Sequence, residues 1–143
     1  MLKLIHSYLA YFVLVVLLIA VFRALSGFIL KKEYKTKMFQ FALSALILSH
    51  IQLLIGMLLY FNNEKFLLWF ELGVLEVMRS DLLRLYLVEH PVANILAITL
   101  ITIGYSKHKR NRLSIPKYKT LATYYTIALI LVLSSIPWNV WPN

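Results

Sequence analysis

Four long apolar segments constrain the fold of this chain more than any other feature. They cover residues 4–30, 38–61, 82–105 and 118–136. Each is near or above the about 20 apolar residues that a helix needs to cross the hydrocarbon layer of a bilayer. Hydrophobic residues make up 61% of the 143 residues, whereas a soluble domain has roughly 45–50%. We therefore expect an all-α, multi-pass membrane protein in which residues 1–143 form one domain of four transmembrane helices.

The first apolar segment differs from a secretory signal peptide in its length and in the residues after it. Its uninterrupted apolar run extends from Leu4 to Phe22, whereas the apolar region of a signal peptide has about 7–15 residues. Arg23 and the pair Lys31-Lys32 come next, which is a stop-transfer pattern. We expect the segment to be retained as a helix.

The charged residues predict how the helices are oriented. The net charge is +9, and the basic residues gather in two loops, 31–37 and 106–119. The middle loop, 62–81, carries four acidic and two basic residues, and the tail, 138–143, carries no charged side chain. Lysine and arginine accumulate in cytoplasmic loops. We expect both basic loops in the cytoplasm of a bacterium and both termini outside its inner membrane, so the charge does not indicate binding to nucleic acid.

Short connections favour an up-down four-helix bundle, in which helices one and three lie diagonally opposite each other. The middle loop is not wholly polar and predicts a short amphipathic helix on the outer surface. Its apolar residues are Phe66, Leu67, Trp69, Phe70, Val74, Leu75 and Met78. This helix would lie in the membrane interface or cover the outer mouth of the bundle.

Three histidines, His6, His50 and His90, lie within the apolar segments. An ionisable side chain at membrane depth is costly and indicates a functional site by default. A rise of about 1.5 Å per residue places His90 ~12 Å, His50 ~16 Å and His6 ~3–5 Å below the outer surface. His108 lies in the basic loop 106–119, where we expect it to be solvated.

Histidines inside a helical bundle suggest a heme site. Heme iron accepts two axial ligands, and imidazole is a common one. Ligands on opposite faces of the ring need backbones about 12–14 Å apart, given metal–nitrogen bonds of ~2 Å, whereas adjacent helices pack at about 8–10 Å. Diagonal helices fit better and favour the pair His6/His90. The pair His50/His90 stays open, because its members differ in depth by only ~4 Å, compared with ~8 Å for His6/His90.

Other polar residues accompany these histidines. Arg84 would neutralise a propionate of heme b, or extend to the lipid headgroups. Gln52 and Gly56 share one helical face, which favours close helix packing and interhelical hydrogen bonds. Pro91 removes a backbone donor next to His90. The alternatives to heme ligation are proton or quinone chemistry without a metal, and hydrogen-bonded packing.

Several chemistries are excluded by composition or motif. The chain has no cysteine, which rules out disulfides, thiolate metal sites, iron–sulfur clusters and covalent c-type heme. It has no phosphate-binding glycine loop, no His-Glu-x-x-His and no nucleophile elbow, which are the signatures of common enzyme classes. We expect no independent catalytic activity.

The segments His50-Ile-Gln-Leu-Leu-Ile-Gly56 and Glu89-His90-Pro91 resemble the heme-binding half of heme A synthases and of related small cytochrome b-type membrane proteins. That resemblance implies a four-helix unit with histidines near the outer ends of alternate helices, and His6 and His90 occupy comparable places. The family's Glu-x-x-His-Arg signature is replaced, with Lys3 at the glutamate position and Ser7 after His6. The resemblance therefore implies heme binding without synthase activity.

Together, these features predict a small b-type cytochrome, an electron-transfer or heme-handling subunit of the lipid bilayer. It would exchange electrons with a quinone, with a membrane-protein partner or within a homo-oligomer. The alternative is a non-enzymatic accessory or assembly subunit of a larger inner-membrane complex. In that case the three histidines would be packing residues.

Overall fold

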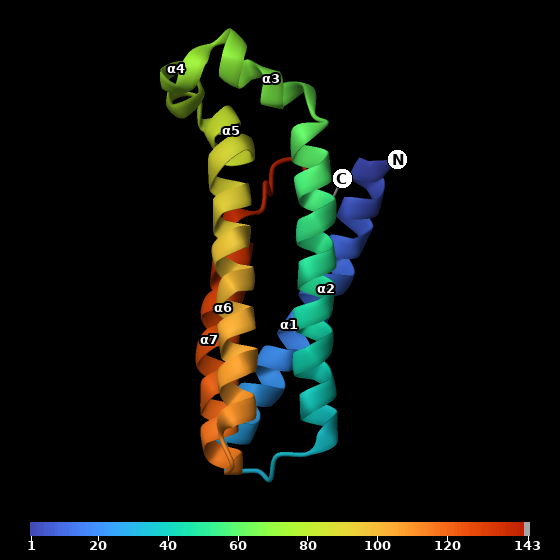
Figure 1. Cartoon of the computed structure of the whole chain (residues 1–143), viewed down its shortest axis with the longest axis vertical. Helices are drawn as coiled ribbons and strands as arrows, with labels where there is room; N and C mark the ends of the chain where they lie inside the picture. The colour runs from blue at the N-terminus through green and yellow to red at the C-terminus, as the bar shows by residue number, and fades with distance from the viewer. Residues whose placement is uncertain (142–143) are drawn as a thin grey trace.

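The computed structural model describes residues 1–141, and the last two residues of the predicted tail, 142–143, lie outside them. Four long helices dominate: α1 (Leu2–Ile29), α2 (Thr36–Phe61), α6 (His90–Arg110) and α7 (Ser114–Ser135). Figure 1 shows them running along the long axis of the molecule. No strand occurs between residues 1 and 141, so the all-α prediction is confirmed.

Three helical stretches are long and apolar enough to cross a bilayer: Leu2–Ile29, Thr36–Phe61 and Asp81–Arg110. The third joins α5 (Asp81–Arg84), the π-helix η1 (Leu85–Glu89) and α6. Their length and composition indicate a membrane protein. Helix α7 has 22 residues but is less apolar, because tyrosines and threonines occupy much of its first half.

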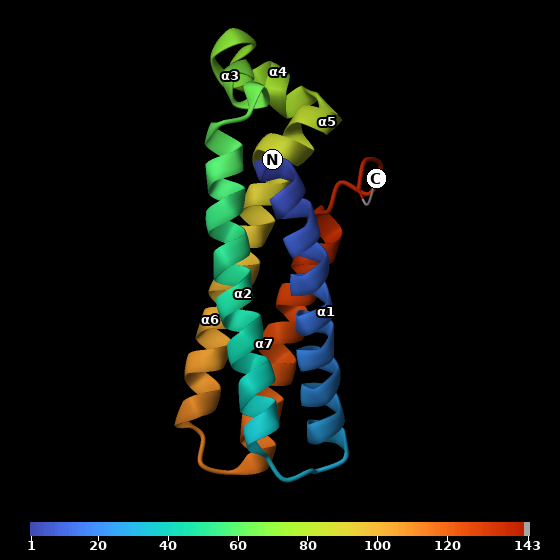
Figure 2. The same cartoon turned by 90° about the vertical axis from the view of Figure 1, so that its right-hand side faces the viewer.

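The four long helices form an up-down bundle with α1 and α6 on a diagonal. Helix α1 packs against α2 and α7, and α6 packs against the same two helices. Figures 1 and 2 show this from two sides, with the N-terminus and the end of α7 near the end covered by the short helices between α2 and α6. We call this end the cap end, and the opposite end, which holds loops 30–35 and 111–113, the basic end.

The hydrophobic core lies towards the basic end. Small residues, Ala20, Ala24, Ala42, Ala45 and Ala97, are fully buried there and let the helix backbones approach closely. By contrast, α1 has no buried residue before Val13, and α2 has none after Ser49. The bundle is therefore tightly packed at its basic end and loosely packed at its cap end.

Two glycines make room for tyrosines of α7 at the basic end. A Cβ atom on Gly27 of α1 would overlap the ring of Tyr118, and one on Gly104 of α6 would lie 2.5 Å from Cβ of Tyr124. Glycine is used where backbones or rings approach this closely. These contacts fix how α7 sits between α1 and α6.

The loop between α2 and α6 is helical, as predicted, but is broken into several pieces. Helices α3 (Glu64–Glu71) and α4 (Gly73–Arg79) meet at Gly73, whose φ of +80° is readily adopted only by glycine. Several large apolar side chains of this cap are exposed, namely Leu67, Phe70, Leu72, Val74, Leu75 and Met78.

The π-helix η1 is explained by the proline just beyond it. Pro91 has no N–H to donate to the carbonyl of Leu87, which is its partner in regular helical pairing. The His90 N–H bonds instead to Leu85, five residues back. The free Leu87 carbonyl accepts a 3.1 Å hydrogen bond from the Tyr60 hydroxyl. That hydroxyl in turn accepts one from Trp69 of the cap, also at 3.1 Å.

Candidate functional site

Two of the three membrane-depth histidines meet inside the cap-end half of the bundle. The rings of His6 and His90 have their centroids 6.3 Å apart and their planes at 78°. They come from α1 and α6, the diagonal pair of helices. Both side chains are partly buried. A loosely packed region thus holds two imidazoles in contact.

The tautomer of His90 is set by a backbone carbonyl. Its Nδ1 lies 3.0 Å from the carbonyl oxygen of Ser135 in α7. A carbonyl only accepts, so Nδ1 carries the proton and Nε2 keeps its lone pair in the neutral ring. The Asn94 amide donates to the His90 carbonyl at 2.7 Å and to the Ser135 hydroxyl at 3.4 Å. These bonds hold the ring and its backbone in place.

Gln52 and Gly56 of α2 lie against His6. The Gln52 side-chain nitrogen donates to the His6 carbonyl at 2.9 Å and lies 3.2 Å from its Nδ1. A Cβ on Gly56 would lie only 3.2 Å from Cε1 of His6. The Gln52 oxygen Oε1 is buried without a hydrogen-bond partner. The helical face that the sequence singles out therefore supports the His6 ring.

His50 lies apart from this pair. Its side chain is exposed, and its Nδ1 donates to the Leu46 carbonyl of its own helix at 2.7 Å. Its Nε2 is 3.4 Å from the Thr102 hydroxyl of α6. The structure thus brings His6 and His90 together and directs His50 to a different face of α2.

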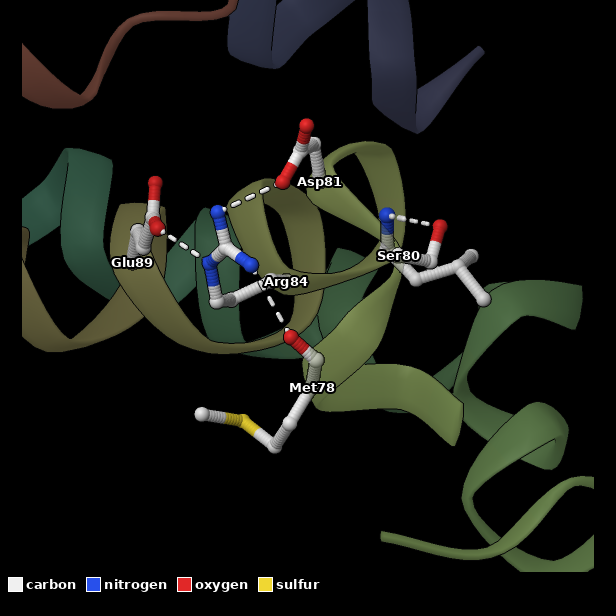
Figure 3. Close-up of polar contacts among 6 residues, drawn as sticks. Met78, Ser80, Asp81, Arg84 and Glu89 are labelled. Carbon is white, nitrogen blue, oxygen red and sulfur yellow. Dashed lines mark hydrogen bonds and ion pairs between the residues drawn. The ribbon is translucent and has the colours of Figure 1, made fainter. Parts of the chain in front are cut away.

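Arg84 joins the cap to the start of the third candidate span. Its guanidinium donates to Glu89 and Asp81, each at 2.8 Å, and to the Met78 carbonyl at 2.9 Å. Figure 3 shows the three bonds spreading from the one side chain. The Asp81 carboxylate is 92% exposed. Arg84 is therefore held by three partners, one of which, the Asp81 carboxylate, is open to solvent.

His108 is not the solvated loop residue that its basic neighbours predict. It lies within α6 and is 0% exposed, so the prediction is wrong. Its ring fits between Phe39 and Tyr105. The lysines beside it in sequence point outwards while the helix turns the imidazole into the bundle.

A buried polar cluster surrounds His108 at the basic end. The Tyr34 hydroxyl is 2.8 Å from its Nε2, and the Tyr34 N–H donates to the Ser114 hydroxyl at 2.9 Å. Tyr118 donates to the Glu33 carbonyl at 3.1 Å. Burial raises the pKa of the Tyr34 phenol, and the neighbouring phenols of Tyr118 and Tyr105 raise it further. The sequence does not single out this cluster, although the i, i+3 spacing of Tyr105 and His108 places both on one helical face.

In residues 1–141 no group of three or more histidine, cysteine, aspartate or glutamate side chains is placed to hold a metal ion. Two imidazoles match the number of axial ligands that a heme iron takes from protein. Comparison of the chain with protein-family models, with curated proteins and with solved structures found no match.

Proposed function

We propose that this protein is a small b-type cytochrome-like membrane protein in which His6 and His90 hold heme b. The observation that carries the proposal is the meeting of the two rings from diagonal helices, with centroids 6.3 Å apart. Two metal–nitrogen bonds of about 2 Å plus the half-widths of two imidazoles give a centroid separation of roughly 6 Å. The observed spacing is of that size, so His6 and His90 are the residues that would hold the iron.

The hydrogen bonds around the pair support this role. Metal-binding histidines commonly donate their second ring nitrogen to a carbonyl, which fixes the tautomer and strengthens the ligand. His90 does this through Ser135. At His6 the Gln52 side-chain nitrogen donates to the backbone carbonyl at 2.9 Å and lies 3.2 Å from Nδ1, so Gln52 holds this residue in place.

The loose packing of the cap-end half favours entry of a planar apolar group. None of the residues of α1 before Val13 or of α2 after Ser49 is fully buried, so separating these segments costs little core packing. Arg84 is the candidate partner of a propionate, because it already holds two carboxylates, one of them largely exposed. A propionate would replace Asp81 in that arrangement.

In this proposal α7 is the fourth membrane-crossing helix, and the chain has its termini and cap outside a bacterial inner membrane. Its packing beside α1 and α6 and the basic residues of both connections at one end support that orientation. Heme supplies one-electron chemistry when bound. The protein residues hold and shield it near the outer face, and a quinone or a membrane-protein partner exchanges the electrons.

The test is an optical spectrum of protein expressed with added heme precursor and purified in detergent. We expect a Soret band, and on reduction the sharp α and β bands of six-coordinate heme. Colourless protein that is folded by circular dichroism would contradict the proposal. An excess of added hemin that leaves the protein unchanged would contradict it equally.

A second function is favoured by the same hydrogen bonds. His6 and His90 each have a protein partner, Gln52 and Ser135, as expected of packing residues in an accessory subunit of a larger membrane complex. Under this alternative the purified chain is colourless, and replacing His90 disturbs its assembly with a partner. The spectrum therefore distinguishes the two functions.

A further inference from the structure

Two surface grooves lie one after the other along the contact between α1 and α7. The first groove, at the basic end, is lined by Lys31, Lys32 and Glu33 after α1 and by residues 113–116 at the start of α7. The second groove is lined by Leu25 and Phe28 of α1 and by Lys119, Thr123, Thr126 and Ile127 of α7, among others. The first groove has a volume of about 390 Å³, and the second has a volume of about 330 Å³.

The two grooves follow one another along the same pair of helices, which run in opposite directions, and we call this row of two grooves the path. On α1 the second groove comes before the first in sequence, and on α7 it comes after. The contact between Gly27 and Tyr118 fixes this register. The path therefore leads from the loops at the basic end into the apolar part of the bundle surface.

The path changes from charged to apolar along its length. Lys31 and Lys32 are exposed at its outer part, where Glu33 is the single carboxylate among the lining residues, and Lys119 lies at the junction. Beyond Lys119 the lining is mostly apolar. The one buried exception is the Thr126 hydroxyl, which has no hydrogen-bond partner.

We propose that this path binds an anionic phospholipid. The lysines would bind its phosphate, and an acyl chain would lie along Leu25 and Ile127. Clustered lysines at a membrane surface recognise anionic headgroups, and an apolar groove directly below them suits the attached chain. This inference goes beyond heme binding and depends only on α1 and α7 lying in a bilayer.

Native mass spectrometry of the detergent-purified full chain tests the proposal. Phosphatidylglycerol and phosphatidylcholine with the same acyl chains are titrated separately. We expect one phosphatidylglycerol per chain to bind at least about tenfold more tightly than phosphatidylcholine, since each lysine at such a surface favours an anionic lipid roughly fivefold. Equal binding of the two lipids would overturn the proposal.

Matched variants separate this site from general basicity. The triple variant Lys31→Gln, Lys32→Gln, Lys119→Gln should lose the preference for phosphatidylglycerol. The triple variant Lys35→Gln, Lys37→Gln, Arg110→Gln removes the same charge from the same end, outside both grooves, and should keep it. An equal loss in both variants would overturn the site.

Two further arms test the acyl chain. Thr123→Trp places a bulky side chain in the apolar groove at an exposed position and leaves the charge unchanged. It should weaken phosphatidylglycerol binding at least about fourfold, the loss expected when roughly one CH₂ group of the acyl chain is kept out of the groove. Unchanged binding, or full competition by millimolar inorganic phosphate, would show a phosphate site without a lipid chain and would overturn the proposal. None of these readouts depends on heme absorbance.

Discussion

The hydroxyl of Tyr34 lies 2.8 Å from Nε2 of His108, and this contact joins the loop after α1 to the end of α6. The other ring nitrogen of His108 faces the Tyr105 carbonyl at 2.5 Å. Since a carbonyl only accepts, Nδ1 donates to it, and Nε2 of the neutral ring accepts from Tyr34. A buried histidine thus ties together two connections that are far apart in sequence.

Replacing Tyr34 by phenylalanine should destabilise the protein. The change leaves the buried Nε2 of His108 without a partner, which costs about 1–3 kcal/mol. We expect a lower unfolding temperature in detergent, measured by circular dichroism, while the helix content is kept. Tyr8→Phe is the matched control, because the Tyr8 side chain is 72% exposed. Equal unfolding temperatures for the two variants would contradict the role of the contact.

The surroundings of His108 show where the sequence misleads. Lys107, Lys109 and Arg110 flank it, and such a run is usually a solvated loop. The helix continues through them to Arg110, and its turn of about 100° per residue separates the three outward cations from the inward imidazole. The side-chain partner of the imidazole, Tyr34, is 74 residues away in sequence. The periodicity of α6 alone does not predict a contact with a residue so far away in sequence.

The bond between Tyr60 and the Leu87 carbonyl should depend on Pro91. In the parent chain Tyr60→Phe leaves that carbonyl unpaired and should lower stability by about 1 kcal/mol. In a Pro91→Ala background the new N–H can reach Leu87, so the same Tyr60→Phe change should cost close to nothing. Unfolding temperatures of the four proteins, all made with Trp69→Phe to remove the second bond to Tyr60, form a double-mutant cycle. Equal costs in both backgrounds would refute the explanation.

The glycines of the chain should respond differently to alanine. Gly27→Ala places a methyl group inside the Tyr118 ring, and overpacking of this kind typically costs 1–3 kcal/mol, so the loss should be at about the upper end of that range. Gly56→Ala meets His6 at 3.2 Å, in the loosely packed half, and should cost less. Unfolding temperatures of the two variants should therefore rank Gly27→Ala as the more damaging. The reverse ranking would contradict the tight packing assigned to the basic end.

The sequence ranks the pair His6/His90 above His50/His90 but does not decide between them. The diagonal placement of α1 and α6 is expected from short connections and an up-down order, and depth estimates alone favoured His50. What separates His50 is its rotation about the axis of α2, where its Nδ1 is used by Leu46. Helix rotation depends on packing against neighbours, here on the fit of His6 to Gly56. Residue spacing does not reveal that fit.

Substitution of the three histidines tests their different positions. His6→Ala and His90→Ala should each abolish the six-coordinate spectrum of heme-loaded protein, because each removes one axial ligand. His50→Ala should leave that spectrum unchanged and serves as the control. Circular dichroism establishes that each variant is folded. A spectrum lost only with His50→Ala would contradict the assignment of the ligands.

The orientation of the chain can be tested directly because it has no cysteine. Single cysteines introduced at Lys35 and at Glu71, both exposed, would lie just before α2 and at the end of α3. The start of α2 and helix α3 are at opposite ends of the bundle (Figure 1). If the basic loops face the cytoplasm, a membrane-impermeant maleimide should label Glu71→Cys in spheroplasts, from which the outer membrane has been removed. It should label Lys35→Cys only after the inner membrane is permeabilised. The opposite pattern would place the basic loops outside, and with them the end of the bundle away from His6 and His90. The proposed heme site would then lie near the cytoplasmic face, where its electron partner would have to be sought.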